Sequence, residues 1–499
     1  MNVNDVRRWH AELAWLDRGV PDPDELARDV LIEASAERVT AVTPGVAVAG
    51  LPPDVTRLPG LTLPGLANAH SHAFHRALRG NAAGSAPGPV GPGRAGGTFW
   101  TWRERMYEVA ARLTPDTYYA LARAVFAEMA LAGISCVGEF HYVHHAAGGK
   151  PYSDPNELGR ALIAAASAAG IRITLLDTCY LASGFAPGGA ALPLAGVQLR
   201  FGDGSASGWA DRLAEFGCDS LGMVASHARL GAAIHSVRAV PPDQMPEVMT
   251  WSHAHAAPVH VHLSEQPREN QESRAAFGGT PSEVLSEAGV LSPRSTMVHA
   301  THLTPSDISL LGASGVTACM CPVTEADLAD GVGPSPALAA AGCALALGSD
   351  GHSVIDLFEE ARWLELSQRY VTRQRGHFTP GELAGVATAG GHGCLGWPDA
   401  GAIVPGAYAD LVTVSLDSPR LAGLATSTTD HRATGAGALG RLFAAGTASD
   451  VRNVVVSGRD VVRDGCHLLV DDVGSALSAA ITAVTDLTGR GSRRRSADG

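Results

Sequence analysis

Three histidines lie close together in the segment GLANAHSHAFHRALRG, which spans residues 65–80. His70 and His72 follow an apolar run, and residues i and i+2 of a β-strand project from the same face. Two neutral imidazoles on one face can share a metal ion. The H-x-H spacing alone is weak evidence for such a site, because ordinary loop histidines also show it.

The same residue types recur after later apolar runs. HVHLSEQ contains His262 and Glu265, VHATH contains His299 and His302, and GSDGH contains Asp350. Imidazole nitrogens and carboxylate oxygens are zinc ligands, and a catalytic zinc site keeps one position open for water. The recurrence favours one shared metal site over several coincidences. Of the two histidines in VHATH, we expect His299 in the site, because it lies nearer the apolar run.

Short apolar runs alternate with helical segments between about residues 60 and 400. The runs cover residues 61–69, 134–140, 171–177, 229–235, 258–263, 295–301, 316–321 and 343–349. The first helix is expected to begin at Thr114 and Pro115 and to stop at Gly133. This α/β pattern is typical of a parallel sheet covered by helices. Eight runs favour a closed (β/α)8 TIM-like barrel, whose catalytic groups gather where the strands end, over an open doubly wound sheet.

The two ends of the chain have a different pattern. Residues 1–60 contain the β-rich pieces VLIEA, RVTAV and VAVAG, and residues 402–485 contain ADLVTV and VRNVVVSGRDVVRDG. We therefore expect both ends to form one small β-sandwich domain beside a barrel of residues 61–401. The Gly/Pro-rich residues 80–97 are expected to form a mobile loop, and residues 486–499 a disordered tail.

The composition argues against several classes of partner and location. A net charge of −13 argues against a nucleic-acid or anionic membrane partner. We find no secretory signal and no run of eighteen apolar residues, so no membrane span is expected. The eight cysteines lack zinc-knuckle spacing and lie mostly in apolar runs, which predicts a reducing, cytoplasmic compartment.

Several segments together resemble a known family. They are NAHSHAFHRALRG, TFWTWRERMYE, GEFHYVHH, IHSVRAV, HVHLSEQ, VHATHLTP, CPVTEADLADG and GSDGHSVIDLFEEARWLELSQR. In this order they are similar to the deaminase branch of the amidohydrolase superfamily, and within it to the formimidoylglutamate deiminases. The resemblance spans residues 66 to 370, and the flanks carry only the superfamily pattern.

The resemblance implies a metal-dependent hydrolase of the C–N bond of a linear amidine. The reaction would convert N-formimidoyl-L-glutamate, a small-molecule substrate of histidine degradation, into N-formyl-L-glutamate and ammonia. One Zn²⁺, or another divalent metal, would be held by His70, His72, His262 and Asp350. Glu265 would carry protons, His299 would hold the attacking oxygen, and Asp350 would orient it.

Lysine usage agrees with a single metal ion. Two-metal members of the superfamily commonly bridge their ions with a carboxylated lysine at a strand end. Lys150 is the only lysine in the chain and lies in a loop after the second run. A lysine-bridged metal pair is therefore excluded.

The resemblance also implies substrate contacts from His75, Arg103, Tyr142, His235 and Arg238. Arginine forks and hydroxyl donors suit the two carboxylates of a glutamate derivative. The family usually has glutamine where this chain has His75, which predicts a contact that is lost or that depends on pH near the imidazole pKa of about 6.5. A homodimer is expected from the resemblance alone.

Three other functions remain open at this point. A deaminase of the same branch would act on a purine, a triazine or an adenosyl compound. A hydrolase of the same substrate would release formamide and glutamate instead. A non-catalytic barrel would serve as an interaction scaffold, although no metal ligand and no base is missing from the sequence.

Overall fold

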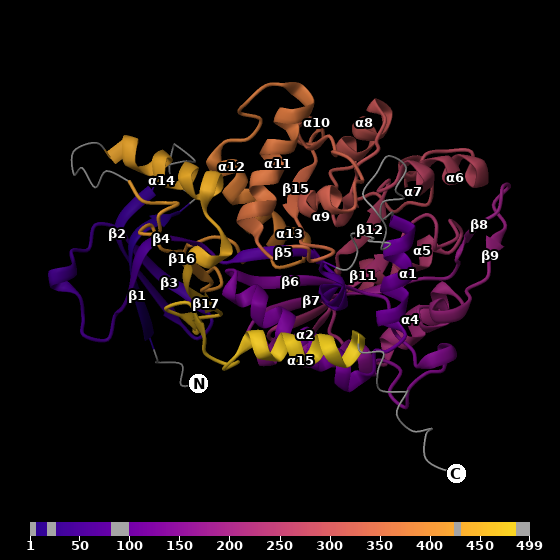
Figure 1. Ribbon diagram of the computed structural model, residues 1–499, viewed down its shortest axis with the longest axis horizontal. Helices are drawn as coiled ribbons and strands as arrows, with labels where there is room; N and C mark the ends of the chain where they lie inside the picture. Colours follow the sequence, from indigo (N-terminus) through magenta and orange to yellow (C-terminus); the bar gives the residue numbers. More distant parts are fainter. Residues whose placement is uncertain (1–5, 17–25, 81–98, 424–430, 486–499) are drawn as a thin grey trace, which may run out of the picture.

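The computed structural model describes residues 6–16, 26–80, 99–423 and 431–485. The side chains of residues 99–101 and 431–436 are outside this description. Apart from Gly80, the expected mobile loop over residues 80–97 and the expected tail over residues 486–499 also lie outside the described residues. Within the described part, a barrel and a smaller sheet lie side by side (Figure 1).

Eight parallel strands form the barrel in chain order (Figure 1). They are β5 (Leu66–Ser71), β6 (Ile134–His141), β7 (Arg172–Cys179), β11 (Ala228–Ile234), β12 (Val259–Leu263), β13 (Ser295–His299), β14 (Thr317–Met320) and β15 (Ala344–Leu347). A parallel bridge between Ser71 and Asp350 joins the two end strands. The predicted (β/α)8 barrel is confirmed.

Helices follow the barrel strands. They are α1 (Phe99–Ala110), α2 (Pro115–Leu131), α3 (Glu157–Ala169), α4 (Ala206–Ala214), α5 (Met245–Ala254), α6 (Pro267–Phe277), α7 (Pro281–Glu287), α8 (Pro305–Ala313), α9 (Pro322–Asp327), α10 (Ser335–Ala341), α11 (Leu357–Thr372), α12 (Pro380–Gly385) and α13 (Gly391–Cys394). The Thr114 side chain caps α2 as expected, and Gly133 follows the helix at φ 87°.

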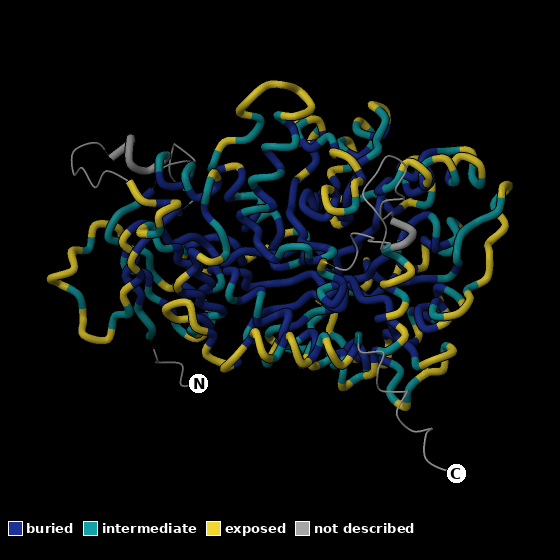
Figure 2. Tube along the Cα trace, in the orientation of Figure 1, coloured by how far each residue is buried: buried dark blue, intermediate teal, exposed yellow. Residues whose placement is uncertain are grey.

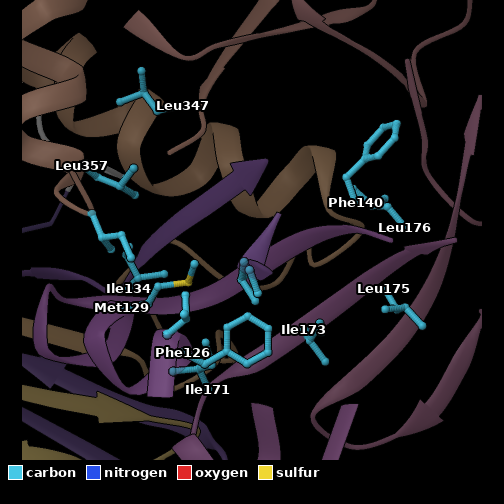
Figure 3. Close-up of a cluster of buried hydrophobic side chains, with 14 of the residues drawn as sticks. Phe126, Met129, Ile134, Phe140, Ile171, Ile173, Leu175, Leu176, Leu347 and Leu357 are labelled. Atoms are coloured by element: carbon cyan, nitrogen blue, oxygen red, sulfur yellow. The ribbon is translucent and has the colours of Figure 1, made fainter. Parts of the chain in front are cut away.

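The core lies between the strands and the helices. Figure 3 shows Phe126 and Met129 of α2 in one buried cluster with Ile134 of β6 and Ile173 of β7. All eight residues of β6 and all eight of β7 are buried. Strands buried on both faces explain why the sequence shows continuous apolar runs here instead of alternation. In Figure 2 these strands are dark blue, and exposed residues lie on the outer elements.

The chain ends build a second sheet of eight strands, ordered β19-β18-β17-β16-β4-β1-β2-β3. The N-terminal strands are β1 (Val6–Trp15), β2 (Leu26–Ser35), β3 (Arg38–Thr43) and β4 (Thr56–Pro64). The C-terminal strands are β16 (Leu411–Val414), β17 (Val451–Val456), β18 (Arg459–Arg463) and β19 (Cys466–His467). The sheet therefore combines strands from both ends of the chain, as the sequence predicts.

Three details differ from the sequence prediction. The run over residues 61–69 is two strands, because the chain passes at Gly65 from β4 of the small sheet to β5 of the barrel. VAVAG is not a strand: Val46 is half-buried, the other four residues are exposed, and the last three form a 3-10 turn (Val48–Gly50). The C-terminal segment also contains α14 (His431–Ala445), which packs on α11 and α12, and α15 (Val473–Thr485), which packs on α2. Among the described residues, no helix has the length and apolarity needed to cross a bilayer.

Candidate active site

A cavity opens where the barrel strands end. Every predicted site residue except His70 lines it: His72, His75, Arg103, Tyr142, His235, Arg238, His262, Glu265, His299 and Asp350. His70 does not line the cavity and is fully buried. The structure therefore brings together residues from six of the barrel strands and from the loops that follow them.

The four predicted metal ligands converge. The Nε2 atoms of His262 and His70 lie 3.1 Å apart. Asp350 Oδ1 is 3.3 Å from His70 Nε2 and 3.5 Å from His72 Nε2. The backbone also brings these ligands close, since the Asp350 N–H donates to the His70 carbonyl at 3.0 Å. A side chain at Gly348 would collide with His70, its Cβ lying 2.7 Å from the His70 Cβ, so only glycine lets these two strand ends approach.

Hydrogen bonds fix which nitrogen each imidazole offers. His72 Nδ1 lies 2.9 Å from the Phe140 carbonyl oxygen, and His262 Nδ1 lies 3.0 Å from the His235 carbonyl oxygen. A carbonyl only accepts, so each Nδ1 carries the hydrogen and each Nε2 keeps a lone pair toward the other ligands. Burial lowers the pKa of His72 to about 3 and that of His262 well below its ordinary value. Neutral, oriented imidazoles beside a carboxylate fit a divalent metal ion.

A buried network holds the H-x-H turn. Glu139 of β6 accepts a hydrogen bond from the Ser71 hydroxyl at 2.6 Å and from the Ala73 N–H at 2.7 Å. The His352 ring bridges the two end strands, with Nε2 3.1 Å from Ser71 Oγ and Nδ1 2.9 Å from Ser349 Oγ. The residues that flank His72 and Asp350 are thereby fixed by the same network.

His299 lies between two carboxylates. Its Nε2 is 3.8 Å from Glu265 Oε1, and its Nδ1 is 3.6 Å from Glu325 Oε1. Burial lowers its pKa, but Glu265, Glu325 and Asp350 together raise the pKa to about 10. His302 instead bonds through Nε2 to the Asp330 carbonyl at 2.7 Å and does not line the cavity. The structure therefore places His299 of the pair beside Glu265.

Burial shifts the pKa of His75 away from the value of about 6.5 that the sequence suggests. Its Nε2 lies 3.0 Å from the Tyr142 hydroxyl, and only 3% of the residue is exposed. Burial and the neighbouring His72 lower its pKa well below 6.5. Desolvation therefore keeps the ring neutral, which argues against a pH dependence near 6.5. The substrate contact expected of His75 stays a prediction.

Five further cavity residues escaped the sequence interpretation: Trp102, Met106, Tyr107, Tyr180 and Phe201. Met106 and Tyr107 stand three and four positions after Arg103 in α1, so helical periodicity places them on the same face and provided a usable signal. Tyr180 and Phe201 lie in irregular segments after β7, where spacing carries no such information.

A second group of metal-type residues lies between the barrel wall and α4. His141, His144 and Asp177 are buried within a distance that a metal ion could span. Asp177, however, already accepts two hydrogen bonds from the Arg212 guanidinium, at 2.7 and 3.0 Å, and one from the Trp209 indole at 2.9 Å. The carboxylate is neutralised by a cation, so this group fits a structural role better than a metal site.

Comparison with known proteins identifies the family. The sequence matches the amidohydrolase family over residues 61–461. It is 38% identical over 453 residues to the formimidoylglutamate deiminase of Pseudomonas aeruginosa, covering 89% of this chain and 93% of that protein. It is 28% identical over 417 residues to the 5-methylthioadenosine/S-adenosylhomocysteine deaminase of Natronomonas pharaonis, covering 81% of this chain and 82% of that protein.

A solved structure agrees with these matches. The crystal structure of an amidohydrolase from Brucella melitensis has a TM-score of 0.80 and 32% sequence identity, covering 96% of this chain and 100% of that one. The resemblance to the formimidoylglutamate deiminases is confirmed, and the protein is a hydrolase that acts on C–N bonds. The barrel, the convergent ligands and the sequence matches agree: the chain belongs to the amidohydrolase family.

Proposed function

We propose that this protein hydrolyses N-formimidoyl-L-glutamate to N-formyl-L-glutamate and ammonia. The observation that carries the proposal is that Arg103 and Arg238 line the same cavity as Glu265 and Asp350. The substrate has two carboxylates, which suit guanidinium groups, and one basic amidine, which suits a site rich in carboxylates. The 38% identity to a formimidoylglutamate deiminase supports the same substrate.

We infer that one divalent ion, most simply Zn²⁺, is held by His70, His72, His262 and Asp350. When bound, the ion would supply Lewis-acid chemistry that makes water acidic enough to ionise near neutral pH. Lys150 is exposed in a loop and so does not serve as a buried bridge between two ions, which supports a single metal.

The chain's own groups would then move the protons. Glu265 would take a proton from the attacking water and deliver it to the departing nitrogen. The water oxygen adds to the formimidoyl carbon, the C–N bond to the terminal nitrogen breaks, and ammonia leaves. His299, beside Glu265, would donate a hydrogen bond to the oxygen as it adds, and Asp350 would accept one from the same water.

The remaining cavity residues would bind and orient the substrate. Arg103 and Arg238 would take the carboxylates, with Tyr142 and His235 as further hydrogen-bonding partners. His75 would replace the family's glutamine through its link to the Tyr142 hydroxyl. Because the other cavity walls are mostly aromatic, these few polar groups would fix the substrate's orientation.

One observation favours a second candidate, a deaminase of a ring substrate. Tyr107, Tyr180 and Phe201 line the cavity and offer faces on which a purine ring could stack. The similarity to an adenosyl-compound deaminase points the same way. Two arginines in one small cavity favour the dicarboxylate, because guanidinium groups pair with carboxylates and a neutral ring offers none.

A direct assay separates these candidates. Ammonia release is measured for the zinc-loaded protein with N-formimidoyl-L-glutamate, guanine and S-adenosylhomocysteine, and the products of the first are identified by mass spectrometry. We expect turnover of the first compound alone, with N-formyl-L-glutamate as product. Turnover of a purine or adenosyl compound but not of the first would overturn the proposal, and formamide with glutamate would overturn the product. The expectations of a homodimer and of a cytoplasmic location stay predictions.

A further inference from the structure

Arg238 has a buried counter-ion that the reaction itself does not use. Glu269, in the first turn of α6, is 1% exposed, and its Oε2 lies 3.7 Å from Arg238 Nε. Burial raises the pKa of Glu269, while the Arg238 charge acts to lower it. A buried carboxylate is stabilised by a nearby arginine charge, so Glu269 can face Arg238 without touching the substrate.

The contact leaves one edge of the guanidinium for a ligand. A guanidinium has an edge that contains Nε and one terminal nitrogen and an edge formed by its two terminal nitrogens, and each edge can bind a carboxylate through two parallel hydrogen bonds. Glu269 approaches Nε, and Arg238 also lines the cavity. The Nε side is therefore directed toward α6, and the terminal nitrogens are left for a carboxylate in the cavity.

Glu269 also competes with Glu265 for the same cation. Both carboxylates raise the pKa of Arg238, which shows that Glu265 is close enough to attract it. An Arg238 side chain that moved onto Glu265 would pair with the proposed base. It would also no longer be placed to bind a substrate carboxylate. A second carboxylate behind the arginine prevents this displacement, because it balances the attraction from Glu265.

We propose that Glu269 is a positioning residue that sets the carboxylate specificity of the cavity by holding Arg238 through its Nε. This inference rests on the proposed function, because it assumes a carboxylate-bearing substrate. It extends that function to a residue that does not line the cavity.

The first test is kinetic. Glu269→Gln keeps the side-chain shape and removes the charge, so KM for N-formimidoyl-L-glutamate should rise about tenfold or more while kcat stays within about threefold. Glu269→Asp keeps the charge, so its KM should lie between those of the wild-type protein and of Glu269→Gln. Glu287→Gln is the matched control, because Glu287 is exposed and lies at the end of the next helix, α7. A purely structural role would lower the active fraction and hence kcat, with KM unchanged, which would overturn the proposal.

A double-mutant cycle isolates the pair. In an Arg238→Ala background, Glu269→Gln should raise KM by no more than about twofold further, because the group that Glu269 positions is already absent. A further tenfold rise in that background would show that Glu269 acts through some other residue and would contradict the proposal.

A binding measurement separates failure of this inference from failure of the proposed function. Glutarate, a dicarboxylate that lacks the amidine, is titrated calorimetrically into zinc-loaded protein, and Glu269→Gln should weaken its binding about tenfold. If the wild-type protein does not deaminate formimidoylglutamate but binds glutarate in this Glu269-dependent way, the proposed function fails and the positioning role stands. If it does deaminate the substrate, and Glu269→Gln alters neither KM nor glutarate binding, the positioning role fails alone. If it neither deaminates the substrate nor binds glutarate, both fail.

Discussion

At the scale of single residues, the site depends on which nitrogen each imidazole presents. The Phe140 and His235 carbonyls hold the Nδ1 hydrogens of His72 and His262, so both Nε2 atoms face the other ligands. The residue types and the H-x-H spacing indicated the ligands from sequence. The orienting carbonyls belong to the backbone and leave no trace in residue identity, so they emerged only from the structure.

The proposed base can be tested by one substitution. Glu265→Gln removes the proton carrier but leaves the proposed ligands intact, so kcat should fall by a factor of about 10² to 10⁴. Zinc content measured by atomic emission should stay near one ion per chain. A variant that keeps more than about a tenth of the activity would show that another group carries the proton.

The state of His75 gives a prediction about pH. Its lowered pKa means that the ring is neutral throughout the neutral range and gains a proton only well below pH 6.5. The ratio of KM between the wild-type protein and His75→Gln should therefore stay constant within about twofold between about pH 6 and pH 8. A ratio that changes as pH passes through 6.5 would mean that the ring titrates as an exposed histidine does.

At the scale of elements, the strand ends could be predicted and the strand junctions could not. Seven of the eight apolar runs match single barrel strands to within two residues at every boundary, because strands buried on both faces are apolar throughout. The exception is the run over residues 61–69, where β4 and β5 are both apolar and only Gly65 separates them. Apolar continuity does not reveal that a chain passes from one sheet to another.

The link between β5 and β15 should determine metal affinity. Ser71→Ala removes the hydroxyl that connects Glu139 with His352 but keeps both neighbouring ligands. Groups that orient metal ligands typically contribute about 10- to 100-fold in affinity, so zinc binding should weaken in that range. Competition with a fluorescent chelator measures this, and an unchanged dissociation constant would assign the network to stability alone.

At the scale of the whole molecule, a buried ion pair joins the barrel to the small sheet. Arg172 begins β7, Asp410 precedes β16, and both side chains are only 1% exposed. Asp410 also accepts the Ser457 N–H at 2.8 Å, which ties the β17–β18 turn to the same point. The two ends of the chain were expected to form this sheet, but the inner strand β1 was not identified, because its segment alternates polar and apolar residues only imperfectly.

This junction should contribute to stability rather than to activity. Asp410→Asn leaves a buried guanidinium without a charged partner, so the protein should lose about 3–5 kcal/mol of stability. The control is Asp399→Asn, which removes the exposed pair with Arg38 and should change stability by less than about 1 kcal/mol. Thermal unfolding measures the stability of both variants. Equal melting temperatures for Asp410→Asn and Asp399→Asn would contradict the importance of the buried pair.

The central claim is that three imidazoles and one carboxylate from the ends of three strands, β5, β12 and β15, hold a single divalent ion. The most direct test is anomalous X-ray diffraction at the zinc edge on crystals of the zinc-loaded protein. We predict one peak, about 2.0–2.2 Å from the Nε2 atoms of His70, His72 and His262 and from an Asp350 oxygen. Absence of that peak, a pair of peaks in the cavity, or a peak at His141, His144 and Asp177 instead would contradict it.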